Sequence, residues 1–163
     1  MTIQPLSQRD KRWTKVLLGF SKYTLGSHGC TLTALCMLIN YIYSATYTPD
    51  QINSILKELG EYHPTKNKYG AFQGALLVWS NVYRKFPKLK HIKRAFNYSN
   101  IEVALYVYVY KLPVLVEVNA SSIGAPRHWV LFIGGGKMND PWTGKEEKTS
   151  KYPLTGYSLY QKA

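Results

Sequence analysis

The chain has 163 residues, a length that fits one domain with a hydrophobic core of its own. Its 21 Lys and Arg residues against 9 Asp and Glu residues give a formal net charge of +12, which favours loose attraction to nucleic acid, anionic cell-wall polymers or acidic lipid surfaces. The basic residues are scattered and match no nucleic-acid-binding motif. We therefore expect a single domain, residues 1–163, that is not a dedicated nucleic-acid-binding module.

The N-terminal segment, MTIQPLSQRDKRW, contains no apolar run of the kind that a secretory signal needs, and so predicts a cytoplasmic protein. The longest apolar stretch, residues 31–42, is too short and too often interrupted by polar side chains to cross a hydrocarbon layer of roughly 30 Å. We therefore expect no membrane span.

Three helices are predicted in the first half of the chain. The nearly all-apolar run that Cys30 opens is typical of a buried helix. Thr48-Pro49-Asp50-Gln51 has the pattern of a capping box and predicts a second helix, which ends at Gly60. Helical spacing of apolar residues predicts a third helix over residues 71–85. The apolar stripe of this third helix consists of Phe72, Ala75, Leu76, Trp79 and Val82.

The middle of the chain holds a basic cluster and a segment of ambiguous pattern. The cluster, from Arg84 to Arg94, is interpreted as a solvated face of the protein. The segment EVALYVYVYK alternates like a strand, but Ser99-Asn-Ile-Glu102 before it has the form of another capping box and favours a helix. We expect that helix to bury a stripe formed by Ile101, Ala104, Leu105 and Tyr108.

After Pro113 the pattern changes to short runs of β-branched and aromatic residues, which predict strands. These runs cover residues 114–118, 128–133, 137–139 and 157–160. Gly134-Gly135-Gly136 has the composition of a hairpin turn. A helical first half followed by an antiparallel sheet predicts an α+β domain, in which a helical lobe packs on a sheet with a cleft between them.

The two cysteines, Cys30 and Cys36, can be read as a disulfide, a metal pair, core residues, or a nucleophile beside a core residue. On one helix they would lie roughly 9 Å apart, farther than the roughly 7 Å that a disulfide allows. With His28 they make no usual zinc spacing, so no metal or cofactor is predicted. Cys36 has the helical spacing of a core residue. Cys30 follows a glycine-containing turn at a helix start, where the helix dipole favours a thiolate, so its position fits a nucleophile and a small structural residue equally.

A base to match Cys30 is present in PRHWVLFIGGGKMNDPWTG. His128 stands at the head of an apolar strand, and Asn139-Asp140 ends the following strand. Two antiparallel strands joined by the three glycines would place His128 beside Asp140, whose carboxylate could orient the imidazole. Asn139 is the alternative orienting residue.

Three further aromatic residues are candidates for the cleft wall. His28 shares a turn with the cysteine, and Trp129 and Trp142 flank the base and the acid. We predict substrate contacts for all three, although core packing also accounts for the tryptophans, and for Trp129 more readily. His63 and His91 lie in polar, lysine-rich surroundings and are predicted on the surface.

These residues belong to an ordered set that covers almost the whole chain. The set consists of Gln8-x-Asp10-x-x-Trp13, Gly26-Ser-His-Gly29-Cys30-Thr-Leu-Thr-Ala, Thr48-Pro49, Pro113, His128-Trp129-Val130 and Asn139-Asp140-Pro141-Trp142-x-Gly144. It resembles the papain-like cysteine peptidases related to the bacteriocin-processing, double-glycine peptidases, most closely the small stand-alone members of bacteria and phages. Many of those relatives carry a smaller residue where this chain has Thr31.

The resemblance implies a papain-like fold, with the nucleophile on a central helix of the α lobe and the base and acid on the β lobe. It implies Cys30 as nucleophile, His128 as general base, Asp140 as orienting acid and Gln8 as oxyanion donor. The implied activity is that of a monomeric, cofactor-free thiol protease that cleaves a peptide or amide bond through a thioester acyl-enzyme. Two alternatives stay open. One is an amidase or endopeptidase for cell-wall peptide, which the positive charge would suit, and the other is a catalytically silent papain-like binding protein of a phage.

Overall fold

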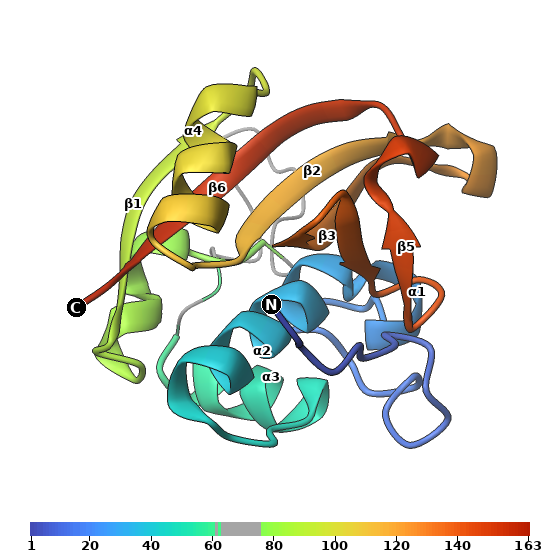
Figure 1. Ribbon diagram of the computed structural model, residues 1–163. Helices are drawn as coiled ribbons and strands as arrows, with labels where there is room; N and C mark the ends of the chain where they lie inside the picture. Colours follow the sequence, from blue (N-terminus) through green and yellow to red (C-terminus); the bar gives the residue numbers. More distant parts are fainter. Residues whose placement is uncertain (61, 63–75) are drawn as a thin grey trace.

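The computed structural model describes residues 1–60, 62 and 76–163, which form a mixed α+β architecture (Figure 1). Its sheet has six antiparallel strands in the order β1-β6-β2-β3-β4-β5. The strands are β1 (Leu89–Ala95), β2 (Val114–Ala120), β3 (Ala125–Gly134), β4 (Lys137–Asp140), β5 (Lys145–Lys148) and β6 (Leu154–Lys162). The α-helices are α1 (Leu25–His28), α2 (Cys30–Tyr43), α3 (Pro49–Glu58) and α4 (Asn100–Ala104). The 3₁₀ turns are η1 (Trp79–Arg84), η3 (Ser121–Ile123) and η4 (Thr149–Lys151), and η2 (Leu105–Val109) is a π-helical turn.

The sheet separates two apolar layers. Helix α2 packs against β3 and β2 on one face, and its side chains share a buried cluster with Leu115 and Leu131 of those strands. Helix α4 and the π-helical turn η2 lie over the other face (Figure 1), where Val103 and Val107 share a second cluster with Val116. No helix formed by residues 1–60, 62 and 76–163 is long and apolar enough to cross a membrane.

Several sequence-based expectations are confirmed. Helix α2 begins at Cys30 and is buried almost all round, because its residues from Leu32 to Ile39 are apolar or small on every face. Helix α3 begins at Pro49, and both hydrogen bonds of the Thr48–Gln51 capping box are present. Gly134 at the end of β3 and the two glycines that follow it all have positive φ, as a tight hairpin turn requires.

The predicted helix over residues 71–85 is wrong for its described part. Residues 71–75 lie outside the described residues, residues 76–78 are not helical, and the chain then forms only the 3₁₀ turn η1. Leu76 is exposed, whereas Val82 is buried as the spacing predicts. His63 also lies outside the described residues.

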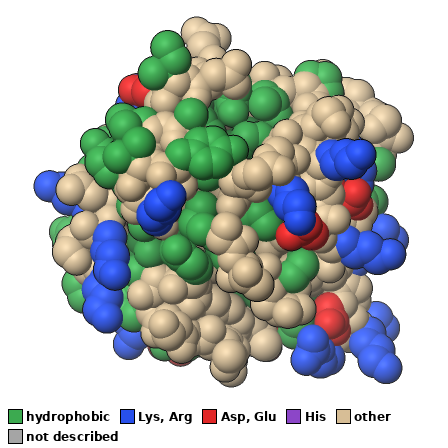
Figure 2. Space-filling view, in the orientation of Figure 1, with side chains coloured by type: hydrophobic (Ala, Val, Ile, Leu, Met, Phe, Trp, Pro, Cys, Tyr) green, Lys and Arg blue, Asp and Glu red, His purple; other side chains and the backbone are tan. Residues whose placement is uncertain are grey.

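Two strands are missing from the sequence-based prediction. Strand β1 runs through the basic cluster and pairs with β6, so the sheet does not follow the helices in a simple order. Strand β5 consists of Lys-Glu-Glu-Lys and pairs with β4 at the other edge. On the face shown in Figure 2 the Lys and Arg side chains are spread over several places and do not form a single patch.

The helix after Ser99 is present, but it buries a different face from the one predicted. Ser99 accepts a hydrogen bond from the Glu102 backbone N–H. The Glu102 carboxylate does not complete a capping box and instead pairs with Lys93 and Tyr157. Val103 and Val107 are buried, whereas 84% of Ile101 is exposed. The buried stripe therefore lies two residues away from the predicted one.

Candidate active site

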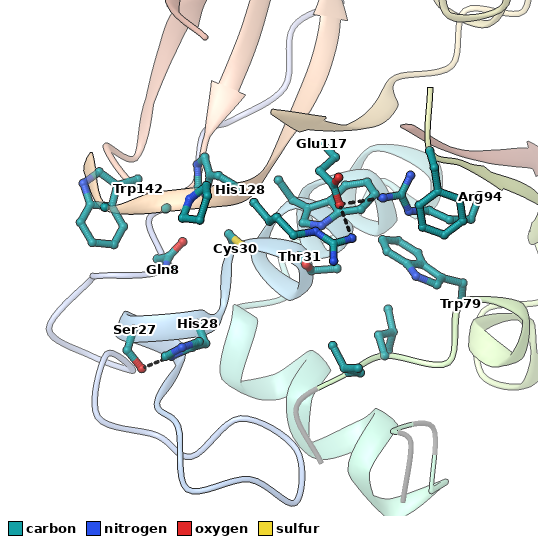
Figure 3. Close-up of a pocket in the computed structure, with 18 residues that line it drawn as sticks. Gln8, Ser27, His28, Cys30, Thr31, Trp79, Arg94, Glu117, His128 and Trp142 are labelled. Carbon is teal, nitrogen blue, oxygen red and sulfur yellow. Dashed lines mark hydrogen bonds and ion pairs between the residues drawn. The ribbon is translucent and has the colours of Figure 1, made fainter. Parts of the chain in front are cut away.

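A cleft of about 650 Å³ brings together residues that are far apart in the sequence (Figure 3). Gln8 comes from the N-terminal segment, Cys30 from the first turn of α2, and His128 from β3. The wall of the cleft is thus formed by residues of both the helical part and the sheet. The four residues predicted for chemistry all lie in or directly behind it, since Asp140 contacts His128 from the end of β4.

The local sequence explains why Cys30 reaches the cleft. Helix α1 ends at His28 and α2 begins two residues later, with only Gly29 between them. A Cβ atom on Gly29 would lie 2.4 Å from the Leu25 carbonyl oxygen, so no other residue fits at this junction. Cys30 is consequently the first residue of a rigid, buried helix and is itself partly exposed, and both cysteines are free thiols.

His128 is held by a short hydrogen bond to Asp140. Its Nε2 atom donates to Oδ1 of Asp140 at 2.7 Å, and the two residues are 1% and 0% exposed. This bond occupies Nε2, and the imidazole and the Cys30 thiol line the same cleft. The structure therefore places a hydrogen-bonded His128–Asp140 pair beside Cys30 in one cleft.

Asp140 is fixed by donors on all sides. Its Oδ1 atom accepts from the Trp142 backbone N–H at 2.8 Å, and its Oδ2 atom accepts from the Tyr152 hydroxyl at 3.0 Å. The Lys151 ammonium lies farther off, at 3.4 Å from Oδ2. A buried carboxylate with this many donors keeps its charge and cannot rotate away from His128.

The electrostatics of this chain favour an ion pair between Cys30 and His128. Burial disfavours the Cys30 thiolate, but the hydrogen bond to His128 and its positive charge outweigh that effect, so the pKa of Cys30 lies below its ordinary value. Burial likewise disfavours the imidazolium, yet the hydrogen bonds to Asp140 and Cys30 raise the pKa of His128 to about 9. Burial opposes the Asp140 carboxylate as well, and its hydrogen bond to His128 holds its pKa below the ordinary value.

Gln8 lies beside this pair but is partly committed elsewhere. Its backbone N–H donates to the Pro141 carbonyl at 2.9 Å, which ties the N-terminal segment to the end of β4. Its side-chain Nε2 donates to the Gly26 carbonyl at 3.0 Å, leaving the second N–H of the amide for another acceptor. The Oε1 atom is buried and has no hydrogen-bond partner among the described residues.

Asn139, the alternative orienting residue, does not contact His128. It is fully buried, and its Nδ2 atom donates to the Ile3 carbonyl at 2.8 Å. The neighbouring pair Leu131–Asn139 sets the register of β3 and β4. Asn139 therefore holds the N-terminal segment, whereas Asp140 holds the histidine.

The three predicted wall residues all line the cleft, in different states. His28 is exposed and stacks on Tyr23 with ring centroids 4.0 Å apart. Trp142 is half-buried, and the Arg9 guanidinium lies 4.5 Å from its ring centroid. Trp129 is 93% buried in the core cluster, as core packing predicts, and also lines the cleft.

His91, predicted on the surface, is only partly exposed. It lies in β1, stacks on Trp79, and hydrogen-bonds the Ser158 hydroxyl through Nε2 at 2.9 Å. Partial burial lowers the pKa of His91 below its ordinary value. The Lys-rich sequence concealed this, because His91 lies between two exposed residues, Lys90 and Ile92.

The cleft also contains a charged group that the sequence analysis missed. Glu117 of β2 is 94% buried and its Oε2 atom accepts from Arg94 at 2.6 Å and from Arg127 at 3.1 Å. A single acidic residue within the apolar run of residues 114–118 was the available signal. Thr31, which follows Cys30 in α2, also lines the cleft.

Within residues 1–60, 62 and 76–163, no three His, Cys, Asp or Glu side chains are placed to hold a metal ion. Comparison of the chain with models of protein families, with curated proteins and with solved structures found no match. The function must therefore be argued from the geometry of the cleft itself.

Proposed function

We propose that the protein is a cysteine peptidase of the papain-like kind, which cleaves a peptide or amide bond with Cys30 as nucleophile. The observation that carries the proposal is the buried hydrogen bond between His128 and Asp140 beside the Cys30 thiol at the wall of a cleft. A thiol, an imidazole and a carboxylate in this order are the groups that thiol-dependent acyl transfer needs.

The first half of the reaction follows from the ion pair. The Cys30 thiolate attacks the substrate carbonyl carbon, and the electron pair of the C=O bond moves to the oxygen. When the tetrahedral intermediate collapses, the C–N bond breaks and the Nδ1 proton of His128 passes to the leaving nitrogen. The product is a thioester between Cys30 and the acyl part of the substrate.

Water completes the cycle. His128, now neutral, accepts a proton from a water molecule as its oxygen attacks the thioester carbonyl. Expulsion of the thiolate releases a carboxylic acid and restores the ion pair. Throughout, Asp140 keeps the imidazole oriented and stabilises its charged form without taking its proton.

The negative oxygen of the intermediate has two candidate donors. One is the backbone N–H of Cys30, which belongs to the first turn of α2 and has no acceptor within the helix. The other is the second N–H of the Gln8 amide, whose orientation the bond to Gly26 fixes. Donors held in place before the reaction stabilise the oxyanion most strongly.

Cleavage of a mixture of unfolded peptides tests this function. The protein as it exists should release new N-termini, detected by mass spectrometry, and Cys30→Ala and His128→Ala should not. Cys36→Ala is the matched control, because Cys36 is fully buried in α2 and away from the cleft. Equal cleavage by Cys30→Ala and the unaltered protein would contradict the proposal.

The net charge of +12 favours one second candidate, hydrolysis of cell-wall peptide. The chemistry at Cys30 would be the same and only the substrate would differ. Clearing of a purified wall suspension by the unaltered protein, and not by Cys30→Ala, would identify this substrate. A protein used only for binding would instead retain affinity for its partner after Cys30→Ala.

A further inference from the structure

Glu117 is a buried acid at the opposite side of the cleft from Trp142 (Figure 3). Its side chain is 8% exposed, yet it contacts two guanidinium groups. Thr155 also donates its hydroxyl to the Glu117 backbone carbonyl at 3.1 Å. A buried carboxylate needs such partners, because an unpaired one would be strongly destabilising.

Arg94 is the partner that neutralises Glu117. Its side chain is 13% exposed and donates to Glu117 at 2.6 Å. The guanidinium lies 4.4 Å from the ring centroid of Phe96 and 4.5 Å from that of Trp129. Arg94 is thus fixed by stacking and by its ion pair, and the two charges compensate each other.

Arg127 is the additional cation. Its side chain is 69% exposed, and its guanidinium donates one hydrogen bond to Glu117 at 3.1 Å. The remaining N–H groups have no acceptor among the described residues. Of the Lys, Arg, Asp and Glu side chains in the described part of the cleft wall, Arg94, Arg127 and Glu117 are present, which leaves one positive charge in excess.

The position of Arg127 relates this charge to the reaction. It immediately precedes His128 in β3, and the side chains of both residues line the cleft with Cys30. Glu117 holds one edge of the guanidinium, which leaves the rest of the planar group facing the cleft and the solvent. Such a guanidinium is well suited to bind a carboxylate through two parallel hydrogen bonds.

We propose that Arg127, held by Glu117 and Arg94, forms a substrate subsite for a carboxylate within one or two residues of the scissile bond. This inference rests on the proposed function. The carboxylate is an Asp or Glu side chain, or the terminal carboxylate of a short peptide.

Two alkylating reagents of the same shape test, without a known substrate, whether the positive charge of Arg127 attracts a carboxylate to Cys30. Iodoacetate and iodoacetamide both form a bond from the Cys30 sulfur to carbon as iodide leaves, but only iodoacetate carries a carboxylate. The ratio of their rate constants at Cys30 cancels any change in the thiolate fraction. We expect Arg127→Gln to lower the iodoacetate-to-iodoacetamide ratio by about threefold, and Arg127→Glu to lower it further.

Lys162→Gln is the matched control, because it removes one exposed positive charge at the far end of β6. It should leave the ratio unchanged. An unchanged ratio in both Arg127 variants would overturn the subsite, while rapid alkylation of Cys30 would still support the proposed function. A Cys30 that reacts no faster than an ordinary thiol would contradict the proposed function and the inference with it.

Peptide pairs then distinguish the two sources of the carboxylate. Peptides with Glu or Gln at each position beside the cleaved bond test a side chain, and peptides with a free or amidated C-terminus test a terminal group. The preferred carboxylate should raise kcat/KM about tenfold, and Arg127→Gln should abolish that preference. Equal kcat/KM for all pairs would overturn the subsite.

Discussion

His128 donates its Nε2–H to Asp140 at 2.7 Å, and this one contact decides which ring nitrogen faces Cys30. The edge of the imidazole that faces Asp140 is shielded from solvent, since Asp140 is fully buried and also accepts hydrogen bonds from Trp142 and Tyr152. The imidazole can therefore exchange a proton only through Nδ1, on the side of the cleft.

Asp140→Asn should impair the reaction while preserving the shape of the site. The amide removes the negative charge that raises the pKa of His128, so the imidazolium becomes less stable and the pKa of Cys30 rises. We expect kcat to fall on the order of 10²-fold or more. The measurement is peptide cleavage at neutral pH, with Lys137→Gln, an exposed change in β4, as the control.

The pH dependence of hydrolysis should be bell-shaped. Activity rises as the pH passes the lowered pKa of Cys30, because the thiolate forms. It falls as the pH rises through about 9, where His128 loses the proton that the leaving group needs. Alkylation of Cys30 needs no such proton and should persist above pH 9. Parallel loss of alkylation and hydrolysis there would contradict the assigned role of His128.

At acidic pH, the free energy of unfolding should depend on the ionisation of Asp140. Its pKa is lower in the folded protein than the ordinary 3.8, so its contribution to the free energy of unfolding is present above pH 3.8 and is lost as the pH falls through the lower, folded value. The difference in unfolding free energy between the unaltered protein and Asp140→Asn should therefore shrink from about pH 6 to about pH 3. Urea unfolding measures it, and a constant difference would contradict the ion pair.

Gly29→Ala should displace Cys30. The added Cβ would lie 2.4 Å from the Leu25 carbonyl oxygen, so the junction of α1 and α2 must move, at a cost of about 1–3 kcal/mol. Gly135→Ala is the matched control, because it has open space and a positive φ that costs about 1–2 kcal/mol. Both variants should lose stability, but only Gly29→Ala should lose peptide cleavage.

Gln8→Ala should reduce kcat by roughly 10²–10³-fold if its free N–H stabilises the oxyanion. Alkylation of Cys30 forms no oxyanion, so its rate and pH dependence should stay the same. Thermal unfolding of the variant shows whether the lost bond to Gly26 also destabilises the fold. Slower alkylation together with slower cleavage would instead indicate a displaced Cys30.

The sequence predicts most of the site because its residues follow strong local patterns. Helix α2 is apolar on every face, which identifies a buried helix and places Cys30 at its start. The hairpin with three glycines brings β4 back along β3, which places Asp140 beside His128. Both relationships depend on neighbouring elements and need no knowledge of the whole fold.

Other features depend on distant partners, and local patterns do not reveal them. Strand β1 carries polar side chains on both faces and fully buries only Leu89, so it shows no strand periodicity and is defined by its pairing with β6. The face that α4 buries is decided by the second cluster on the sheet, where Val103 packs. The ion pair of Arg94 with Glu117 likewise joins two strands separated in the sheet by β6.

The rate of Cys30 alkylation by iodoacetamide against pH, read by peptide mass spectrometry, tests the central claim most directly. We expect rapid labelling well below the pH at which an ordinary thiol ionises, near 8.5, and a shift of the profile to higher pH in His128→Ala. Cys36, fully buried and with a raised pKa, is the internal control and should remain unlabelled. A Cys30 profile that follows an ordinary thiol and does not change in His128→Ala would contradict the account.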